Sequence, residues 1–196
     1  MQRSRTNPER TEATREALLA AARTLFTAKG YAETSTPEIV AAAAVTRGAL
    51  YHHFADKRAL FEAVVRREAA SVAEAIEAAT PPAAGASARD ALIAGSLAYL
   101  DAMAVPGRSR LLLLDGPAVL GPATMSAIDR AHAAQSLAQG IAAAEAAGAL
   151  CAGPAGALSD LLSAAFDRAA LEIAGGGAAE PYRQAMISLI EAVTRP

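Results

Sequence analysis

The sequence is poor in residues that mark several protein classes. Its 196 residues include one cysteine and no tryptophan, and aromatic residues make up only 4% of the chain. A lone Cys151 provides neither an internal disulfide framework nor a cysteine-based metal cluster, and we expect it to be a small buried hydrophobic residue. The polar start of the chain lacks the apolar stretch of a secretory signal. The longest leucine run, Leu111–Leu114, ends at Asp115, far short of a bilayer span. We therefore expect a cytoplasmic protein with no membrane partner.

Motifs of common enzyme classes are also missing. We find no Walker-type phosphate loop, no histidine or cysteine cluster with metal-ligand spacing, and no serine elbow. The glycine run 175–177 lacks the strand and the lysine that a phosphate loop needs, so it is interpreted as a linker. We expect no catalytic activity and no cofactor. A helical-bundle enzyme or an adaptor without a DNA role remains an alternative at this point.

What the chain does contain favours helices and an uneven distribution of charge. Hydrophobic residues make up 53% of it, much of this alanine, which is the strongest intrinsic helix former. The formal net charge is −2, but residues 1–67 hold eleven Lys or Arg against seven Asp or Glu, whereas residues 68–196 hold seven against thirteen. A basic first third suggests a face that binds a polyanion, although ordinary variation between solvated surfaces would give the same imbalance.

Helical periodicity and helix-end signals predict an all-α fold. A polar arm up to about Arg10 precedes a helix that ends near Gly30. A capping box of Ser35 and Glu38 begins a short helix, which runs from Thr36 to about residue 43. Further helices are expected over residues 47–54, from 56 to about 79, and roughly over 87–104, 108–114, 118–148, 155–174 and 181–194, with a possible break at 121–122. Two domains follow from this pattern, over residues 12–72 and 85–196.

The two short helices, joined by a tight turn and supported by a third, form the smallest unit that can present a helix to a DNA major groove. Placing residues at 100° intervals puts Arg47, Gly48, Tyr51 and His52 on one arc of the second helix. Leu50 and Phe54 lie on the opposite arc and must pack against the supporting helices, together with Ala49 and His53. The first arc offers groups suited to base edges and phosphates.

At these residues the sequence resembles the DNA-binding domain of the TetR family of regulators. The resemblance covers about residues 12–72, with the helix-turn-helix at about 35–54, and Leu50-Tyr51-His52-His53-Phe54 followed by Lys57 is its most diagnostic part. The remainder is similar to the family only in helical character and size. One departure is Ala44, which stands where the family usually has glycine and could strain the turn.

The resemblance implies roles for the matching positions. Ser35 and Thr36 would hold a phosphate at the start of their helix, and Lys57 would anchor another. Thr46, Arg47, Gly48 and Ala49 would lie at the leading end of the recognition helix, where bases are contacted. Tyr51 and His52 would lie between base and backbone, while His53 would combine packing with a possible phosphate contact. Arg3, Arg5 and Arg10 would either reach a minor groove or form a solvated tail.

The second domain is expected to dimerise and to bind a small molecule. Exposed apolar faces on the last two helices would form the dimer interface, through Leu158, Leu162, Phe166, Met186, Leu189 and Ile190, although an intramolecular core would explain half of such residues. Candidate pocket residues are Leu97, Leu100, Met103, Leu111, Leu114, Asp115, Leu120 and Met125. Because few polar groups lie near them, we expect a largely apolar effector.

These expectations combine into a repressor that binds a palindromic operator as a homodimer and is released when the effector shifts the long helix. A DNA-binding regulator without ligand control is the nearest alternative.

Overall fold

The computed structural model describes residues 7–80, 87–151 and 153–195, and these residues confirm the all-α prediction. Their only strand-like feature is an isolated bridge between Leu150 and Thr194. The elements are α1 (Asn7–Lys29), α2 (Thr36–Ala42), α3 (Arg47–His53), α4 (Lys57–Ala79), α5 (Ala88–Met103), the π-helix η1 (Arg110–Asp115), α6 (Gly116–Leu120), α7 (Pro122–Arg130), α8 (Ala133–Ala146), α9 (Ala155–Ala174) and α10 (Ala179–Val193). No helix of the described residues is long and apolar enough to cross a membrane.

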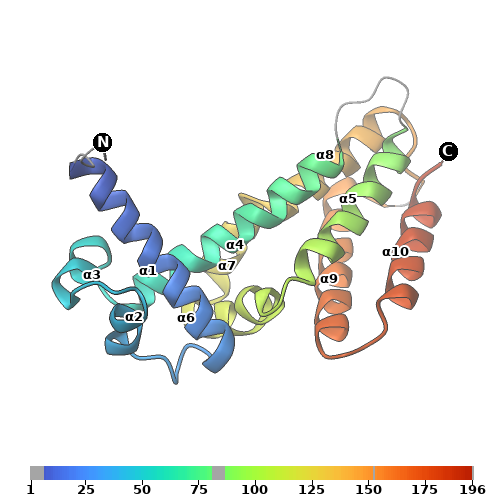
Figure 1. Cartoon of the computed structure of the whole chain (residues 1–196). Helices are drawn as coiled ribbons and strands as arrows, with labels where there is room; N and C mark the ends of the chain where they lie inside the picture. The colour runs from blue at the N-terminus through green and yellow to red at the C-terminus, as the bar shows by residue number, and fades with distance from the viewer. Residues whose placement is uncertain (1–6, 81–86, 152, 196) are drawn as a thin grey trace, which may run out of the picture.

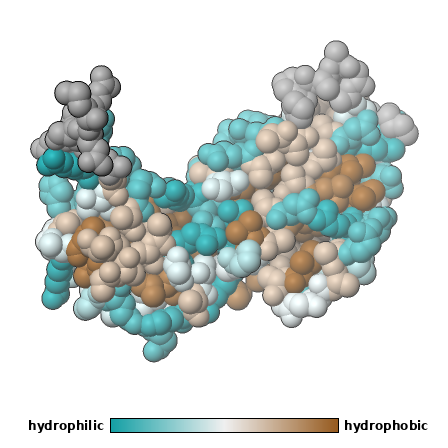
Figure 2. All heavy atoms as spheres, viewed as in Figure 1, coloured by the Kyte–Doolittle hydropathy of each residue, from teal (hydrophilic) through white to brown (hydrophobic). Residues whose placement is uncertain are grey.

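The helices form two lobes joined by α4 (Figure 1). Helices α1, α2 and α3 make up one lobe, which we call the head, and α5 with α8, α9 and α10 make up the other, which we call the body. Helix α4 packs against α1 near its start and against α5 and α8 further along. The space-filling view shows the two lobes as separate masses with a narrower middle (Figure 2).

The head is built on a cluster of aromatic rings. The ring of Phe61 on α4 meets Phe26 edge-on at a centroid distance of 5.1 Å and Tyr31 at 5.0 Å. Such edge-to-face pairs add about 0.5–1.5 kcal/mol beyond the burial of their surface. Leu50 of α3 and Ile39 of α2 are fully buried in the same core. The two short helices are therefore held by packing, because neither is long enough to be stable alone.

The body has its own core between α5, α8, α9 and α10. Its buried members are Leu92, Leu100, Ile141, Ala144, Leu162, Phe166, Ala169, Met186 and Ile190. The end of the chain is fastened to this core, since Arg89 on α5 donates to the hydroxyl and the carbonyl oxygen of Thr194. The chain thus has two distinct cores, and helices α5 and α9 contribute buried residues to both.

Several boundaries differ from the sequence prediction. Helix α1 already begins at Asn7, so Arg10 is helical rather than part of an arm, while Arg3 and Arg5 lie outside the described residues. The possible break at 121–122 is confirmed, because Gly121 adopts a φ of +87° between α6 and α7, but the chain turns again at His132, which was not expected. The segment expected as an ordinary helix over 108–114 is π-helical over Arg110–Asp115. Cys151 is exposed, not buried as expected.

Candidate DNA-binding face and effector cavity

The start of α2 is fixed by the predicted capping box. The Ser35 hydroxyl accepts from the backbone N–H of Glu38 and donates to its carboxylate, which in turn accepts from the Ser35 backbone. Lys29 at the end of α1 forms an ion pair with the same carboxylate. These hydrogen bonds, first that from Lys29 and then those from Ser35, lower the pKa of Glu38 to about 2. The Ser35 side chain therefore serves the helix start, and the expected phosphate contact stays a prediction.

The turn between α2 and α3 contains the one non-glycine residue among those described with positive φ. Ala44 has a φ of +53°, a left-handed conformation that costs an L-residue about 1–2 kcal/mol. This agrees with the strain expected for alanine at a position where the resembling family has glycine. The backbone N–H of the next residue, Val45, bonds to the carbonyl of Val40 and closes the turn. The turn holds its shape despite the strained residue.

Helix α3 presents a buried and an exposed side, as the 100° projection predicted. The Thr46 hydroxyl caps its start by accepting from the backbone N–H of Ala49 at 3.1 Å. Leu50 is fully buried, and Phe54 at the end is 6% exposed. Thr46, Arg47, Gly48, Tyr51 and His52 are exposed. Ala49 and His53 are half-buried, so these two expected contacts lie at the edge of the exposed side.

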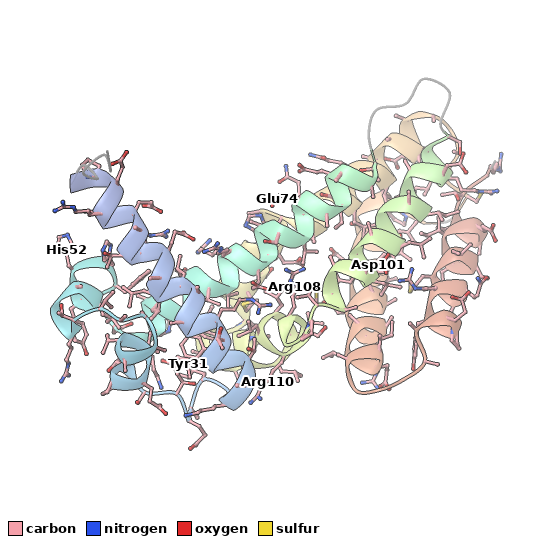
Figure 3. The ribbon with its side chains drawn as sticks, viewed as in Figure 1. Tyr31, His52, Glu74, Asp101, Arg108 and Arg110 are labelled. Atoms are coloured by element: carbon pink, nitrogen blue, oxygen red, sulfur yellow. The ribbon has the colours of Figure 1, made fainter. Side chains whose placement is uncertain are left out.

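The exposed side of α3 is an ordered polar strip. The Arg47 guanidinium lies over the Tyr51 ring, 5.5 Å from its centroid, and one guanidinium nitrogen is 3.5 Å from the Tyr51 hydroxyl. Hydrogen bonds from Arg47 and from Thr36 on α2 lower the pKa of Tyr51. Thr36, Arg47 and Tyr51 therefore connect α2 to α3 across the surface. His52 lies at the outer edge of the head (Figure 3), with its ring 5.3 Å from that of His53.

Lys57, expected as a phosphate anchor, has a different position. Its ammonium donates to the carbonyl oxygens of Tyr31 and Thr34, both at 2.9 Å, and lies 4.2 Å from the centroid of the Tyr31 ring. Two of its three donors thus hold the loop between α1 and α2 against the start of α4. In the structure, Lys57 stabilises the head through internal hydrogen bonds. A phosphate contact through its third donor stays a prediction.

A buried ion-pair network joins the head to the body midway along α4. Glu68 is 5% exposed and accepts from Arg23 of α1 and from Arg108, which precedes η1 (Figure 3). Burial raises the pKa of Glu68, but the hydrogen bonds from Arg23 and Arg108 outweigh it, and the pKa is lowered. Arg108 also donates to the carbonyl of Ala102 at the end of α5. The sequence analysis did not find this network, because its members are 45 and 40 residues apart.

Two cavities lie beyond this network, on the side of the body. The larger has a volume of about 510 Å³ between α4, α5, α7, α8 and α9. The smaller, about 310 Å³, lies between α4, α5, η1, α6, α7, α8 and α9. Tyr99, Asp129, Ala133 and Asp167 line both, so the two cavities adjoin. The tyrosine hydroxyl donates to Asp167 at 2.5 Å.

Most of the expected pocket residues lie elsewhere. Of the eight candidates, Met103 and Met125 line the smaller cavity and none lines the larger one. Leu100, Leu111 and Leu120 are buried in the two cores, Leu97 is half-buried outside both cavities, Leu114 is 54% exposed, and Asp115 forms an ion pair with Arg110. The expectation favoured leucines because they are apolar, but Leu100, Leu111 and Leu120 pack into the two cores instead.

Most of the residues expected at the dimer interface lie inside the body. Leu162, Phe166, Met186 and Ile190 are each 4% exposed or less and belong to the core of the body. Phe166 moreover lines the larger cavity. Leu158 is half-buried, and Leu189 is 44% exposed. Leu161 on α9 is 71% exposed, so Leu161 and Leu189 are the large apolar side chains on α9 and α10 that remain available to a partner.

The two lobes match two models of one family. Residues 18–64 match the model described as bacterial regulatory proteins of the tetR family, and residues 89–196 match the tetracyclin repressor-like C-terminal domain. The first match covers most of the head with the start of α4, and the second begins in α5 and covers the body.

Similar proteins agree with these matches. The HTH-type transcriptional repressor BepR of Brucella suis is 44% identical over 63 residues, which are 32% of this chain and 30% of that protein. The Tn10 TetC protein of Escherichia coli is 35% identical over 92 residues, 47% of each chain. The chain thus aligns with less than half the length of these curated relatives.

Solved structures extend the likeness to nearly the whole chain. A TetR-family regulator from Pectobacterium atrosepticum is 33% identical, with a TM-score of 0.70 over 96% of this chain and 95% of that one. A regulator from Shewanella sp. PV-4, at 23% identity, has the same fold, with a TM-score of 0.75 over 93% and 99% of the two chains. These findings favour a regulator over the enzyme or adaptor that the sequence had left open. The chain belongs to the TetR family of bacterial transcriptional regulators.

Proposed function

We propose that the protein is a homodimeric repressor that binds a palindromic operator through α3 and leaves it when a small molecule occupies the cavities of the body. The observation that carries this proposal is the exposed strip of Arg47, Tyr51 and His52 on a helix whose opposite side buries Leu50 completely. An arginine can bind guanine or a phosphate with two hydrogen bonds. Because the Arg47 guanidinium already stacks on the Tyr51 ring, its side chain would lose less conformational entropy on binding DNA.

Dimerisation through α9 and α10 would supply the second half-site contact, since one recognition helix reads too few base pairs for useful specificity. Leu161 and Leu189 support such an interface because they are large, apolar and exposed. Regulators of this family typically act as dimers. We propose that an aspartate at either position weakens the dimer and, with it, operator binding.

The proposed route from effector to DNA runs along α4. Ile76 and Glu77 of α4, with Thr80 directly after it, line the larger cavity, and Ala69 and Val72 line the smaller one. At the other end, Lys57 fastens the loop of the head to the start of the same helix. An effector that binds one position of α4 more tightly than another would therefore shift the equilibrium between these positions, and with it the position of the head. Its difference in affinity for the two positions sets how far the equilibrium shifts.

Operator binding by α3 can be tested with two variants that affect the fold little. Arg47→Ala should weaken binding of the preferred operator about 10- to 100-fold and relax base preference, whereas Arg66→Ala, which removes an exposed arginine on α4, should leave it unchanged. Fluorescence anisotropy with an operator found by selection from random duplexes measures both. Equal affinity of Arg47→Ala and the parent for every duplex would contradict the assignment of α3.

Gly48 separates DNA contact from folding more sharply. A methyl group at this position would meet only the Thr46 hydroxyl oxygen, at 3.9 Å, and Ala is a better helix former than Gly by about 0.8–1.0 kcal/mol. Gly48→Ala should therefore fold at least as stably as the parent but bind the operator more weakly, because the methyl would stand between the helix and the duplex. Unchanged operator affinity would show that the backbone of α3 does not approach the DNA closely.

A further inference from the structure

The walls shared by the two cavities are acidic. Asp129 on α7 and Asp167 on α9 line both cavities, and Glu77 on α4 adds a third carboxyl to the larger one. Among the residues that the structure describes, no lysine, arginine or histidine lines either cavity. Burial raises the pKa of Asp129. The hydrogen bond from the Ala134 backbone and the nearby charges of Arg130 and His132 lower it, but by less than burial raises it.

The two aspartates retain unused capacity to accept hydrogen bonds. Asp167 accepts from the Tyr99 hydroxyl, and Asp129 accepts from the backbone N–H of Ala134 in the first turn of α8. A carboxylate offers about four acceptor positions, so each has room for a donor from inside the cavity. Burial, partly opposed by the Tyr99 hydrogen bond and reinforced by Asp129, raises the pKa of Asp167 to about 6. A positive charge placed between the two carboxylates would relieve this unfavourable burial.

The remaining walls are apolar and aromatic. Ile76, Leu92 and Phe166 line the larger cavity, and Met103, Leu113 and Met125 line the smaller one. The rings of Tyr99 and Phe166, with centroids 5.8 Å apart, bring two aromatic groups to the acidic wall, and aromatic faces attract organic cations. A volume of about 510 Å³ is within the range of pockets that bind drug-sized ligands.

We propose that the effector of this protein is an amphipathic organic cation, whose protonated nitrogen lies between Asp129, Asp167 and Tyr99 and whose apolar body fills the adjoining cavity. That the ligand acts as an effector rests on the proposed function, whereas its chemical class is inferred from the cavity itself. It replaces the largely apolar molecule expected from the sequence, since that expectation overlooked both aspartates.

Three probes with one apolar body and different charge test the class of ligand. We expect 4-phenylbutylamine to bind the purified protein about 10- to 100-fold more tightly than 4-phenylbutanol at pH 7.5, because it forms charge-assisted hydrogen bonds. We expect 4-phenylbutyrate to show no binding at the same concentrations. Isothermal titration calorimetry without DNA measures all three. Equal affinity for the amine and the alcohol, or no binding of the amine up to millimolar concentration, would overturn the inference.

Variants assign the preference to the two aspartates. Asp129→Asn and Asp167→Asn keep the size of each side chain and should each reduce the affinity for the amine about 10-fold or more, while the affinity for the alcohol stays the same. Asp160→Asn, an exposed carboxylate on the same helix as Asp167, should change neither. Loss of binding of both the amine and the alcohol in Asp167→Asn would indicate a collapsed cavity, so Asp129→Asn then decides. A preference for the amine that survives both substitutions would overturn the assignment.

Operator release is measured separately, so that the two proposals can fail independently. If the amine binds through the aspartates but leaves operator affinity unchanged, the class of ligand stands and the proposed release mechanism fails. If neutral compounds release the operator as well as cations do, the proposed function stands and the inference fails.

Discussion

The α3 side of the head and the cavity wall of the body hold their polar side chains in different ways. In the head, capping contacts join residues three apart, as in Ser35 with Glu38 and Thr46 with Ala49, and the side chains of the α3 strip stay in solvent. In the body, Tyr99 and Asp167, 68 residues apart, meet in the wall of a cavity. Local contacts order the α3 strip, whereas the two half-buried aspartates of the cavity wall have no lysine, arginine or histidine beside them in the described lining.

The largest effect is expected where the two lobes meet. Glu68→Gln should lower the free energy of unfolding by about 3 kcal/mol, because it leaves the charge of Arg108, whose side chain is 11% exposed, without its buried partner. Urea denaturation followed by circular dichroism measures this. Glu74→Gln, on the same helix but exposed (Figure 3), should change stability by less than about 0.5 kcal/mol. A similar loss in both variants would show that charge on α4, not the buried network, is responsible.

The acids of the body should cost stability at neutral pH. Because burial raises the pKa of Asp167 from 3.8 to about 6, the folded protein keeps a proton between these values that the unfolded chain has released. Stability from this group therefore falls as the pH rises through this interval, and the loss is complete above pH 6. Asp167→Asn should raise the free energy of unfolding by about 1–2 kcal/mol at pH 7.5 and by less at pH 5.

Urea denaturation at the two pH values measures this effect, with Asp160→Asn as the control. Asp129, Glu77, Arg130 and His132 are further ionisable side chains near the same site, so the difference between the variant and the parent at each pH is the informative quantity. A variant less stable than the parent at both pH values would show that the Asp167 carboxylate stabilises the free body.

In the head, loss of a cap should have a smaller effect. Thr46→Ala removes the oxygen that accepts from the Ala49 backbone, and it should lower the free energy of unfolding by about 1 kcal/mol. Thr46→Ser keeps that oxygen and should recover most of the loss. Equal stability of the two variants would mean that the cap contributes little to α3.

The smallest effect concerns the turn before α3. Ala44→Gly removes the cost of a left-handed alanine but adds freedom to the unfolded chain, so the free energy of unfolding should rise by about 0.5 kcal/mol. Ala44→Val should lower it, because a branched side chain fits this conformation less well. A lower stability for the glycine variant would contradict the strain attributed to Ala44.

The same contrast explains which features were predictable from the sequence. The capping box, the buried side of α3 and the strain at Ala44 follow from neighbouring residues, and they were expected correctly. The cavities depend on how five or more helices pack, and no local pattern places Asp129 beside Asp167. The positions of the core leucines and of Phe166 were not predictable for the same reason: an apolar helix face can pack within the chain, line a cavity or bind a partner, and spacing does not distinguish these outcomes.

Helix α4 has 23 residues and is unbroken, which makes it a rod of about 34 Å. A rotation of about 5° about its cavity end would carry its other end through roughly 3 Å, close to the rise of about 3.4 Å between successive base pairs. Under the proposed mechanism, a change in the body smaller than one side-chain diameter would therefore be enough to displace α3 by about one base-pair rise. Geometric amplification of this kind requires no large motion anywhere in the molecule.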